Sequence, residues 1–158
     1  MKIIAVSDTH GRPDRLIEAV EKYTDADLFV HCGDGASDLE IAENAYPHKK
    51  FYGVCGNCDF ICSLPPEILF TADGKRVYVT HGHLYDVKHG LYRLLDVARK
   101  HRADIVLFGH THSTYCRYRD GIWFVNPGAG RGRGAKAAVV DICGDSVTCR
   151  LEEIEDEV

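Results

Sequence analysis

Short apolar runs alternate with amphipathic segments through the first third of the chain. Runs at 2–6, 27–32 and 50–54 have the length and apolar content of buried strands. The segments between them, at 13–22 and 37–45, carry apolar residues at helical spacing and predict two helices. Strands separated by single helices are typical of parallel βαβ units, so this part of the chain predicts a parallel sheet.

The rest of the chain contains more strands than helices. Asp73-Gly74 joins the segments 68–72 and 75–80 and is a hairpin signal, while apolar spacing at 88–100 predicts a third helix. Further strands are predicted at 104–108, 115–119, 122–125, 137–142 and 147–151. Consecutive strands favour antiparallel pairing, so we expect an α/β sandwich of two sheets.

Length and composition narrow the classes of function. The chain has 158 residues, of which 45% are hydrophobic, so we expect one domain over 1–158 with an acidic end, about 152–158, that frays. The net charge of −5 argues against stable binding to nucleic acid or anionic lipid. No apolar run suits a secretion signal or the ~20 residues of a membrane span, so we expect a cytoplasmic protein. Seven cysteines, an odd number, favour reduced thiols.

Side chains of the types that bind metal ions follow five of the predicted strands. Sites in open α/β sheets form beyond the carboxyl ends of the strands, so these loops are expected to converge. The candidate ligands are Asp8, His10, Asp34, Asn57, His81, His110 and His112. Each has an ordinary structural explanation when taken alone, but five coincidences at strand ends favour a shared site. The histidines without this placement, expected to be structural, are His31, His48, His89 and His101.

This ligand set exceeds the needs of one tetrahedral ion and suits two ions that share a carboxylate. Mixed nitrogen and oxygen donors favour Mn, Fe, Co, Ni or Zn. Paired ions in hydrolases activate a water molecule and stabilise both oxygens of a displacement. Two divalent ions offset by Asp8, Asp34 and a hydroxide leave a charge of roughly +1, which favours an anionic substrate such as a phosphate ester.

The motifs occur in a fixed order along the chain. They are Asp8-Thr9-His10-Gly11, Gly33-Asp34, Gly56-Asn57-Cys58-Asp59, His81-Gly82-His83, Gly109-His110-Thr111-His112 and Asn126-Pro127-Gly128. Together they resemble the calcineurin-like metallophosphoesterases, and among these the small YfcE-like phosphodiesterases of bacteria and archaea. The resemblance covers Ile3 to about Gly130. It implies the metallophosphatase fold, a four-layer αββα sandwich of two mixed sheets flanked by helices, with a dinuclear metal centre.

The resemblance also implies a role for each motif residue. One ion would be held by Asp8, His10 and His112, the other by Asn57, His81 and His110, with Asp34 as the bridge. The implied reaction is in-line attack of a metal-bound hydroxide on a phosphodiester, with Mn as the expected ion. Asn57 would also help to hold phosphate oxygens, and Asp59 would orient a ligand imidazole.

Three more residues are candidates for contact with the substrate. Many members of the superfamily have His where this chain has Cys58, and a thiol is a weak hydrogen-bond donor. His83 is a candidate to replace that His, and Arg12 adjoins the first motif. Cys55 and Cys58 also match a C-x-x-C redox or zinc pattern, but no second pair completes it.

Several alternatives stay open at this point. A phosphomonoesterase and a non-catalytic interaction scaffold share the implied fold, and the intact ligand set favours an enzyme over the scaffold. A nuclease is disfavoured by the net charge. The expected partner is a small phosphate ester. A homo-oligomer, and a pairing of Cys143 with Cys149 across a hairpin, are left open.

Overall fold

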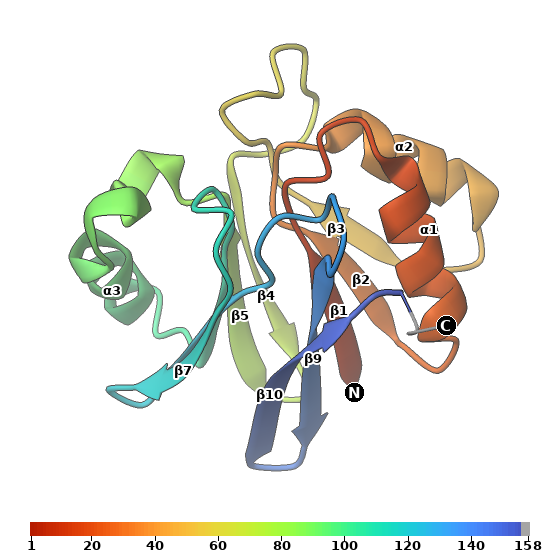
Figure 1. The fold of residues 1–158 in the computed structure, drawn as a ribbon. Helices are drawn as coiled ribbons and strands as arrows, with labels where there is room; N and C mark the ends of the chain where they lie inside the picture. The colour runs from red at the N-terminus through yellow and green to blue at the C-terminus, as the bar shows by residue number, and fades with distance from the viewer. Residues whose placement is uncertain (156–158) are drawn as a thin grey trace.

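The computed structural model describes residues 1–155, in which two five-stranded sheets pack face to face (Figure 1). The first sheet has the order β10 (Ser146–Glu153), β9 (Lys136–Cys143), β1 (Lys2–Val6), β2 (Leu28–His31) and β3 (Phe51–Gly53). The second has the order β4 (Glu67–Ala72), β5 (Lys75–Thr80), β6 (Ile105–Leu107), β8 (Ile122–Asn126) and β7 (Tyr115–Arg119). Strands β1, β2 and β3 are parallel, as are β5, β6 and β8, and the other strands add antiparallel pairs.

Helices cover the outer faces of the two sheets. On one side lie α1 (Pro13–Lys22) and α2 (Ala36–Ala45), and on the other lies α3 (Tyr92–Lys100), preceded by the short turns η1 (His83–Tyr85) and η2 (Val87–His89) (Figure 1). Among the described residues no helix has the length and apolar character needed to cross a bilayer. The predicted four-layer αββα sandwich is confirmed.

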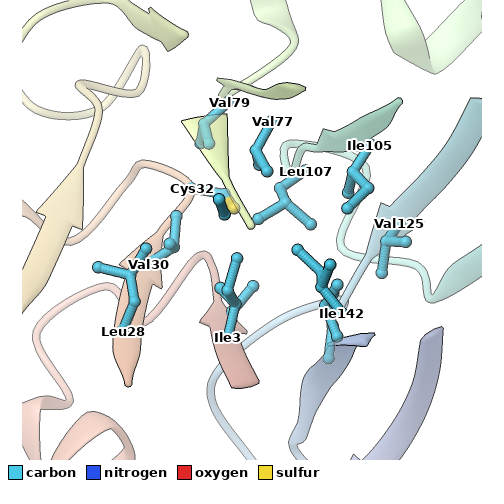
Figure 2. Close-up of a cluster of buried hydrophobic side chains, with 14 of the residues drawn as sticks. Ile3, Leu28, Val30, Cys32, Val77, Val79, Ile105, Leu107, Val125 and Ile142 are labelled. Carbon is cyan, nitrogen blue, oxygen red and sulfur yellow. The ribbon is translucent and has the colours of Figure 1, made fainter. Parts of the chain in front are cut away.

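The core between the sheets comes from alternate strand residues. Ile3 of β1 points into this core, while Ile4 packs with α1 on the outer face, as the two-residue period of a strand requires. Figure 2 shows Val30 and Cys32 on one side of the core and Leu107 on the other. Because both sheets are held by this core, the loops at their shared edge are fixed relative to one another.

Two local expectations are wrong. The helix expected at 88–100 begins only at Tyr92, because residues 87–89 form the short turn η2 and Gly90 (φ 135°) has a backbone conformation that interrupts the helix. The acidic end does not fray at 152, since β10 continues to Glu153 and Ile154 is buried. Residues 156–158 of that segment lie outside the described residues.

The cysteines also differ from expectation. Cys55 and Cys62 form a disulfide, so the reduced state predicted for the thiols is wrong for this pair. Cys143 and Cys149 are free and lie opposite Ser146 and Val140 in the β9–β10 ladder, so they do not pair with each other.

Candidate metal centre

The loops after β1, β2, β3, β5 and β6 meet at one edge of the sandwich. The Nε2 atom of His112 lies 3.2 Å from Asp8 Oδ1, and the Nε2 atom of His81 lies 3.2 Å from Asp34 Oδ2. His10 Nε2 connects the two halves, at 3.7 Å from Asp8 Oδ1 and 3.6 Å from Asp34 Oδ2. Five of the seven expected ligands therefore converge through atoms that bind metals.

The other two expected ligands adjoin this group. Asn57 Oδ1 lies 3.1 Å from His81 Nε2. The ring of His110 lies 5.0 Å from the ring of His81, centroid to centroid, and its backbone N–H donates to Asp8 Oδ2. The structure thus brings together all seven side chains.

The carboxylate of Asp8 provides a test of whether a metal ion fits. It is fully buried, and its Oδ2 accepts hydrogen bonds from Ser7 Oγ and the His110 N–H, but Oδ1 has no hydrogen-bond partner. A buried carboxylate oxygen without a donor is costly. A cation among Asp8, His10 and His112 would satisfy it, and the residues present therefore fit a metal.

The charge state of the centre also suits cations. Burial raises the pKa of the Asp34 carboxyl, but hydrogen bonds from His81 and Cys58 outweigh it and hold that pKa well below its usual range. Burial lowers the pKa of His110 to about 4, so its imidazole is neutral at neutral pH and has a lone pair available.

His81 behaves differently because it faces both carboxylates. Burial lowers its pKa, but the hydrogen bond to Asp34 and the charges of Asp8 and Asp34 raise it overall. The Nδ1–H of His81 donates to the carbonyl of Cys32 at 2.7 Å, which turns Nε2 toward the carboxylates. Nε2 of His81, 3.2 Å from Asp34 Oδ2, is the atom that a ligand imidazole would offer to a metal ion.

The backbone at this edge is held in an uncommon conformation. The expected ligands Asp8, His10, Asp34, His110 and His112 all have positive φ, between 46° and 69°. Only a few per cent of non-glycine residues adopt this region. Such a concentration at one site requires neighbours that impose it.

Two glycines allow the close approach of these loops. A Cβ atom at Gly109 would overlap Ser7 Oγ and lie 2.6 Å from Asp8 Oδ2. A Cβ atom at Gly56 would overlap Asp34 Oδ1. Both glycines are therefore required by contact with the carboxylates.

A buried network that the sequence analysis missed supports the first loop. His31 Nε2 lies 3.0 Å from Thr9 Oγ1, which in turn donates to Asp38 Oδ2. Asp38 Oδ2 also accepts the backbone N–H of Gly11 and of Arg12. His31 is thus structural, as expected, but it supports the loop that carries Asp8 and His10.

A second support lies under the loop that follows β6. The buried Asn126 donates through Nδ2 to the Gly109 carbonyl and to Thr111 Oγ1, both at 3.0 Å, and its Oδ1 accepts the Gly128 N–H. Asn126 could have been identified from the sequence, because it belongs to the motif at 126–128. Asn126 therefore fixes the backbone on either side of His110.

Asp59 has a different role from the one expected. Its carboxylate accepts three backbone N–H groups, those of Asp34 at 2.9 Å, Gly56 at 2.8 Å and Ala36 at 3.0 Å. None of its hydrogen bonds reaches an imidazole, so the expected orientation of a ligand histidine is wrong. Asp59 instead holds the backbone of Asp34 and the loop that carries Asn57.

The three candidates for substrate contact are placed unequally. Cys58 is exposed at the centre, and its backbone N–H donates to Asp34 Oδ1 at 2.7 Å. The His83 ring lies 5.4 Å from the His81 ring, and its buried Nδ1 has no hydrogen-bond partner. Arg12 forms two hydrogen bonds to Asp14 at the exposed start of α1, so it is not gathered with the ligands, and its contact with substrate stays a prediction.

Comparison with known proteins identifies the family. The sequence profile of the calcineurin-like phosphoesterase superfamily domain matches residues 1–146. The chain belongs to this superfamily. It is 34% identical over 166 residues to a probable metallophosphoesterase, YsnB, of Bacillus subtilis, covering 99% of this chain and 96% of YsnB. It is 27% identical to the phosphodiesterase YfcE of Escherichia coli, covering 82% of this chain and 79% of YfcE.

Two solved structures, one of a predicted phosphoesterase and one of Vps29, share the fold. A predicted phosphoesterase from Streptococcus pneumoniae aligns with a TM-score of 0.84 at 29% identity, covering 99% of this chain and 91% of that one. Vps29 from Entamoeba histolytica, solved with Zn²⁺, aligns with a TM-score of 0.75 at 16% identity, covering 98% of this chain and all of that one. The second likeness concerns the fold alone.

Proposed function

We propose that this calcineurin-like protein is a dinuclear metal-dependent phosphoesterase that hydrolyses phosphodiester bonds, with Mn²⁺ as the preferred ion. The observation that carries the proposal is the buried, unpartnered Oδ1 of Asp8 among imidazole nitrogens and a second carboxylate. A scaffold with no need of metal has no use for such an arrangement. The phosphodiesterase named among the relatives supports the substrate class.

The proposed ligands divide between two ions. Asp8, His10 and His112 form one group, and their ligand atoms lie within 4.8 Å of one another, as do those of Asp8, Asp34 and His81. Asn57 and His110 complete the second group, with Asp34 between the two. Bound there, the ions would supply an activated water molecule and positive charge for the phosphate oxygens.

The residues of the chain account for substrate charge and for the leaving group. With two carboxylates and a hydroxide offsetting two divalent ions, a charge of roughly +1 matches the single negative charge of a diester better than the two of a monoester. Burial and the neighbouring His81 lower the pKa of His83, so at neutral pH its ring is uncharged and carries one N–H. In the proposed reaction His83 and the Cys58 thiol face the alcohol that leaves.

The experiment is turnover of a chromogenic diester and of the matching monoester by protein stripped of metal and then reloaded with Mn²⁺. We expect turnover only after reloading, with the diester preferred and two ions bound per chain. Asp34→Asn should lower kcat/KM by about a thousandfold, because the bridging charge is lost. Asp145→Asn, an exposed aspartate in the β9–β10 turn, is the control and should retain the wild-type rate.

Two results would reject parts of the proposal. Less than one bound ion per chain and no turnover of either ester would leave the non-catalytic scaffold, whose fold Vps29 shares. Faster turnover of the monoester would retain the metal centre and overturn the diester preference.

A further inference from the structure

Cys58, which faces the leaving alcohol in the proposed reaction, also lies beside two of the proposed metal ligands. Its Sγ, a ring nitrogen of His10 and a carboxylate oxygen of Asp34 lie within 4.8 Å of one another. Sulfur, imidazole nitrogen and carboxylate oxygen together form a ligand set typical of zinc. His10 and Asp34 are also proposed ligands of the dinuclear centre, so the thiol adjoins that centre directly.

The loop that carries the thiol is held to Asp34 through its backbone. The Cys58 N–H donates to Asp34 Oδ1 at 2.7 Å, and the Asn57 side chain lies 3.5 Å from Sγ. Oδ2 of Asp34 faces His10 and His81, so the two oxygens of one carboxylate hold the loop and the centre together. Cys58 is exposed, and an ion from solvent therefore reaches Sγ without a change in fold.

A separate observation indicates that this part of the molecule takes a cation. Asp8 is fully buried, and its unpartnered Oδ1 lies 3.7 Å from His10 Nε2. His10 thus belongs both to the group of ligand atoms that contains Asp8 and to the group that contains Cys58. A carboxylate oxygen and a thiol both bind divalent cations.

We propose that Cys58 is a sulfur ligand for thiophilic divalent ions such as Zn²⁺ and Cd²⁺ when these occupy the metal centre in place of Mn²⁺. This inference rests on the proposed function, because it shares His10 and Asp34 with the dinuclear centre. A soft sulfur ligand strengthens binding of Zn²⁺ and Cd²⁺ and adds little for Mn²⁺, which prefers oxygen. On binding, the metal–sulfur bond replaces the S–H bond, and the proton passes to solvent.

In the test, metal-free protein is titrated with Cd²⁺. Binding is monitored by the sulfur-to-cadmium charge-transfer absorption and by calorimetry. We expect the band to grow until one Cd²⁺ is bound by sulfur in each chain. Cys58→Ser should abolish the band and weaken Cd²⁺ affinity by about 10- to 100-fold. Removal of a residue that only hydrogen-bonds to a metal ligand already weakens metal affinity by this amount, and removal of a ligand should cost at least as much. Mn²⁺ affinity should change by less than about threefold.

Cys143→Ser is the matched control, since Cys143 is also a free and exposed cysteine but lies in β9. It should retain both the band and the Cd²⁺ affinity. Circular dichroism and the Tm of each variant verify that it is folded. Cd²⁺ binding by wild type with no charge-transfer band, or a band that survives in Cys58→Ser, would overturn the sulfur inference.

The two proposals fail in different ways. If Mn²⁺ binds and supports turnover while no sulfur band forms, the dinuclear centre stands and the role of Cys58 is rejected. If Mn²⁺ neither binds nor supports turnover, the proposed function is rejected, whatever the absorption with Cd²⁺ shows.

Discussion

The two edges of the sandwich contain the same unusual backbone conformation for different reasons. At the hairpin edge, Asp73 and Asp120 have φ near 50°, and each is followed by a glycine with φ of 80°. Asp-Gly is the sequence that such two-residue turns prefer, so the local sequence itself favours the conformation. At the opposite edge, which carries the candidate metal centre and is called the metal edge below, the residues with positive φ are histidines and aspartates that belong to no hairpin turn.

The difference lies in what stabilises each edge. A non-glycine residue in a sparsely populated region costs about 1–3 kcal/mol and persists when its surroundings impose it. The Asp8 N–H donates to the Gly33 carbonyl and the His10 N–H to the Asp34 carbonyl, both at 3.0 Å, so the first two loops hold each other. The metal edge therefore depends on contacts between distant segments, and it should be far more sensitive to substitution than the hairpin edge.

The largest difference between the edges is expected from alanine at two glycines. Gly109→Ala places a Cβ against Ser7 Oγ and 2.6 Å from Asp8 Oδ2, which displaces the buried carboxylate. We expect a loss of about 3 kcal/mol in the free energy of unfolding, together with loss of metal binding. Urea denaturation and calorimetric titration with Mn²⁺ measure the two effects.

Gly121→Ala is the counterpart at the hairpin edge. Apart from its chain neighbours, no atom of the described residues lies within 4 Å of its added Cβ, but its φ of 80° disfavours alanine. The expected loss is about 1 kcal/mol with metal affinity unchanged. Equal losses of stability in both variants, with metal binding intact in Gly109→Ala, would contradict the contrast between the edges.

The expected ligands could be predicted because topology brings them together. Parallel strands in both sheets end at the same edge, so His81 and His112 meet Asp8 although each lies more than seventy positions away in the sequence. Residue type then indicated the chemistry. This reasoning needs only the apolar runs and the residues that follow them.

The supporting residues could not be predicted in the same way. Asp59 resembles the ligands in type and position, yet its partners are backbone N–H groups, which leave no trace in the sequence. The pair Thr9 and Asp38 is unremarkable until folding places it beside His31. The Cys55–Cys62 disulfide was missed because cysteine spacing alone does not determine pairing.

The second prediction concerns pH and the buried support of the metal edge. Burial lowers the pKa of His31 to about 4, below the ordinary ~6.5. Between these values the unfolded chain binds more protons, so stability is full above about pH 6.5 and falls as the pH drops toward 4. The loss at His31 amounts to roughly 3 kcal/mol. His110, with a pKa of about 4, contributes with the same sign in metal-free protein.

His31→Asn should flatten this pH dependence by about half, measured by urea unfolding of metal-free protein between pH 4 and 7. The asparagine oxygen can still accept the Gly33 N–H that His31 Nδ1 accepts at 3.2 Å. His48→Asn, at an exposed histidine before β3, is the control and should keep the wild-type slope. An unchanged slope in His31→Asn would show that this network does not govern the metal edge at low pH.

The smallest effect is expected where support is given only through backbone. Asp59→Asn removes a charge and one acceptor from the three N–H groups that fix Asp34 and Gly56, without removing a ligand. We expect Mn²⁺ affinity to fall by about 10- to 100-fold, while kcat at saturating Mn²⁺ stays within about threefold of wild type. Asp104→Asn is the matched control at the opposite edge, because Asp104 also accepts a backbone N–H, that of Arg76 at 2.8 Å, and should leave both quantities unchanged. A fall in kcat that excess Mn²⁺ does not restore would assign Asp59 to the reaction itself. An equal loss of Mn²⁺ affinity in Asp104→Asn would mean that the two edges are coupled through the whole sandwich.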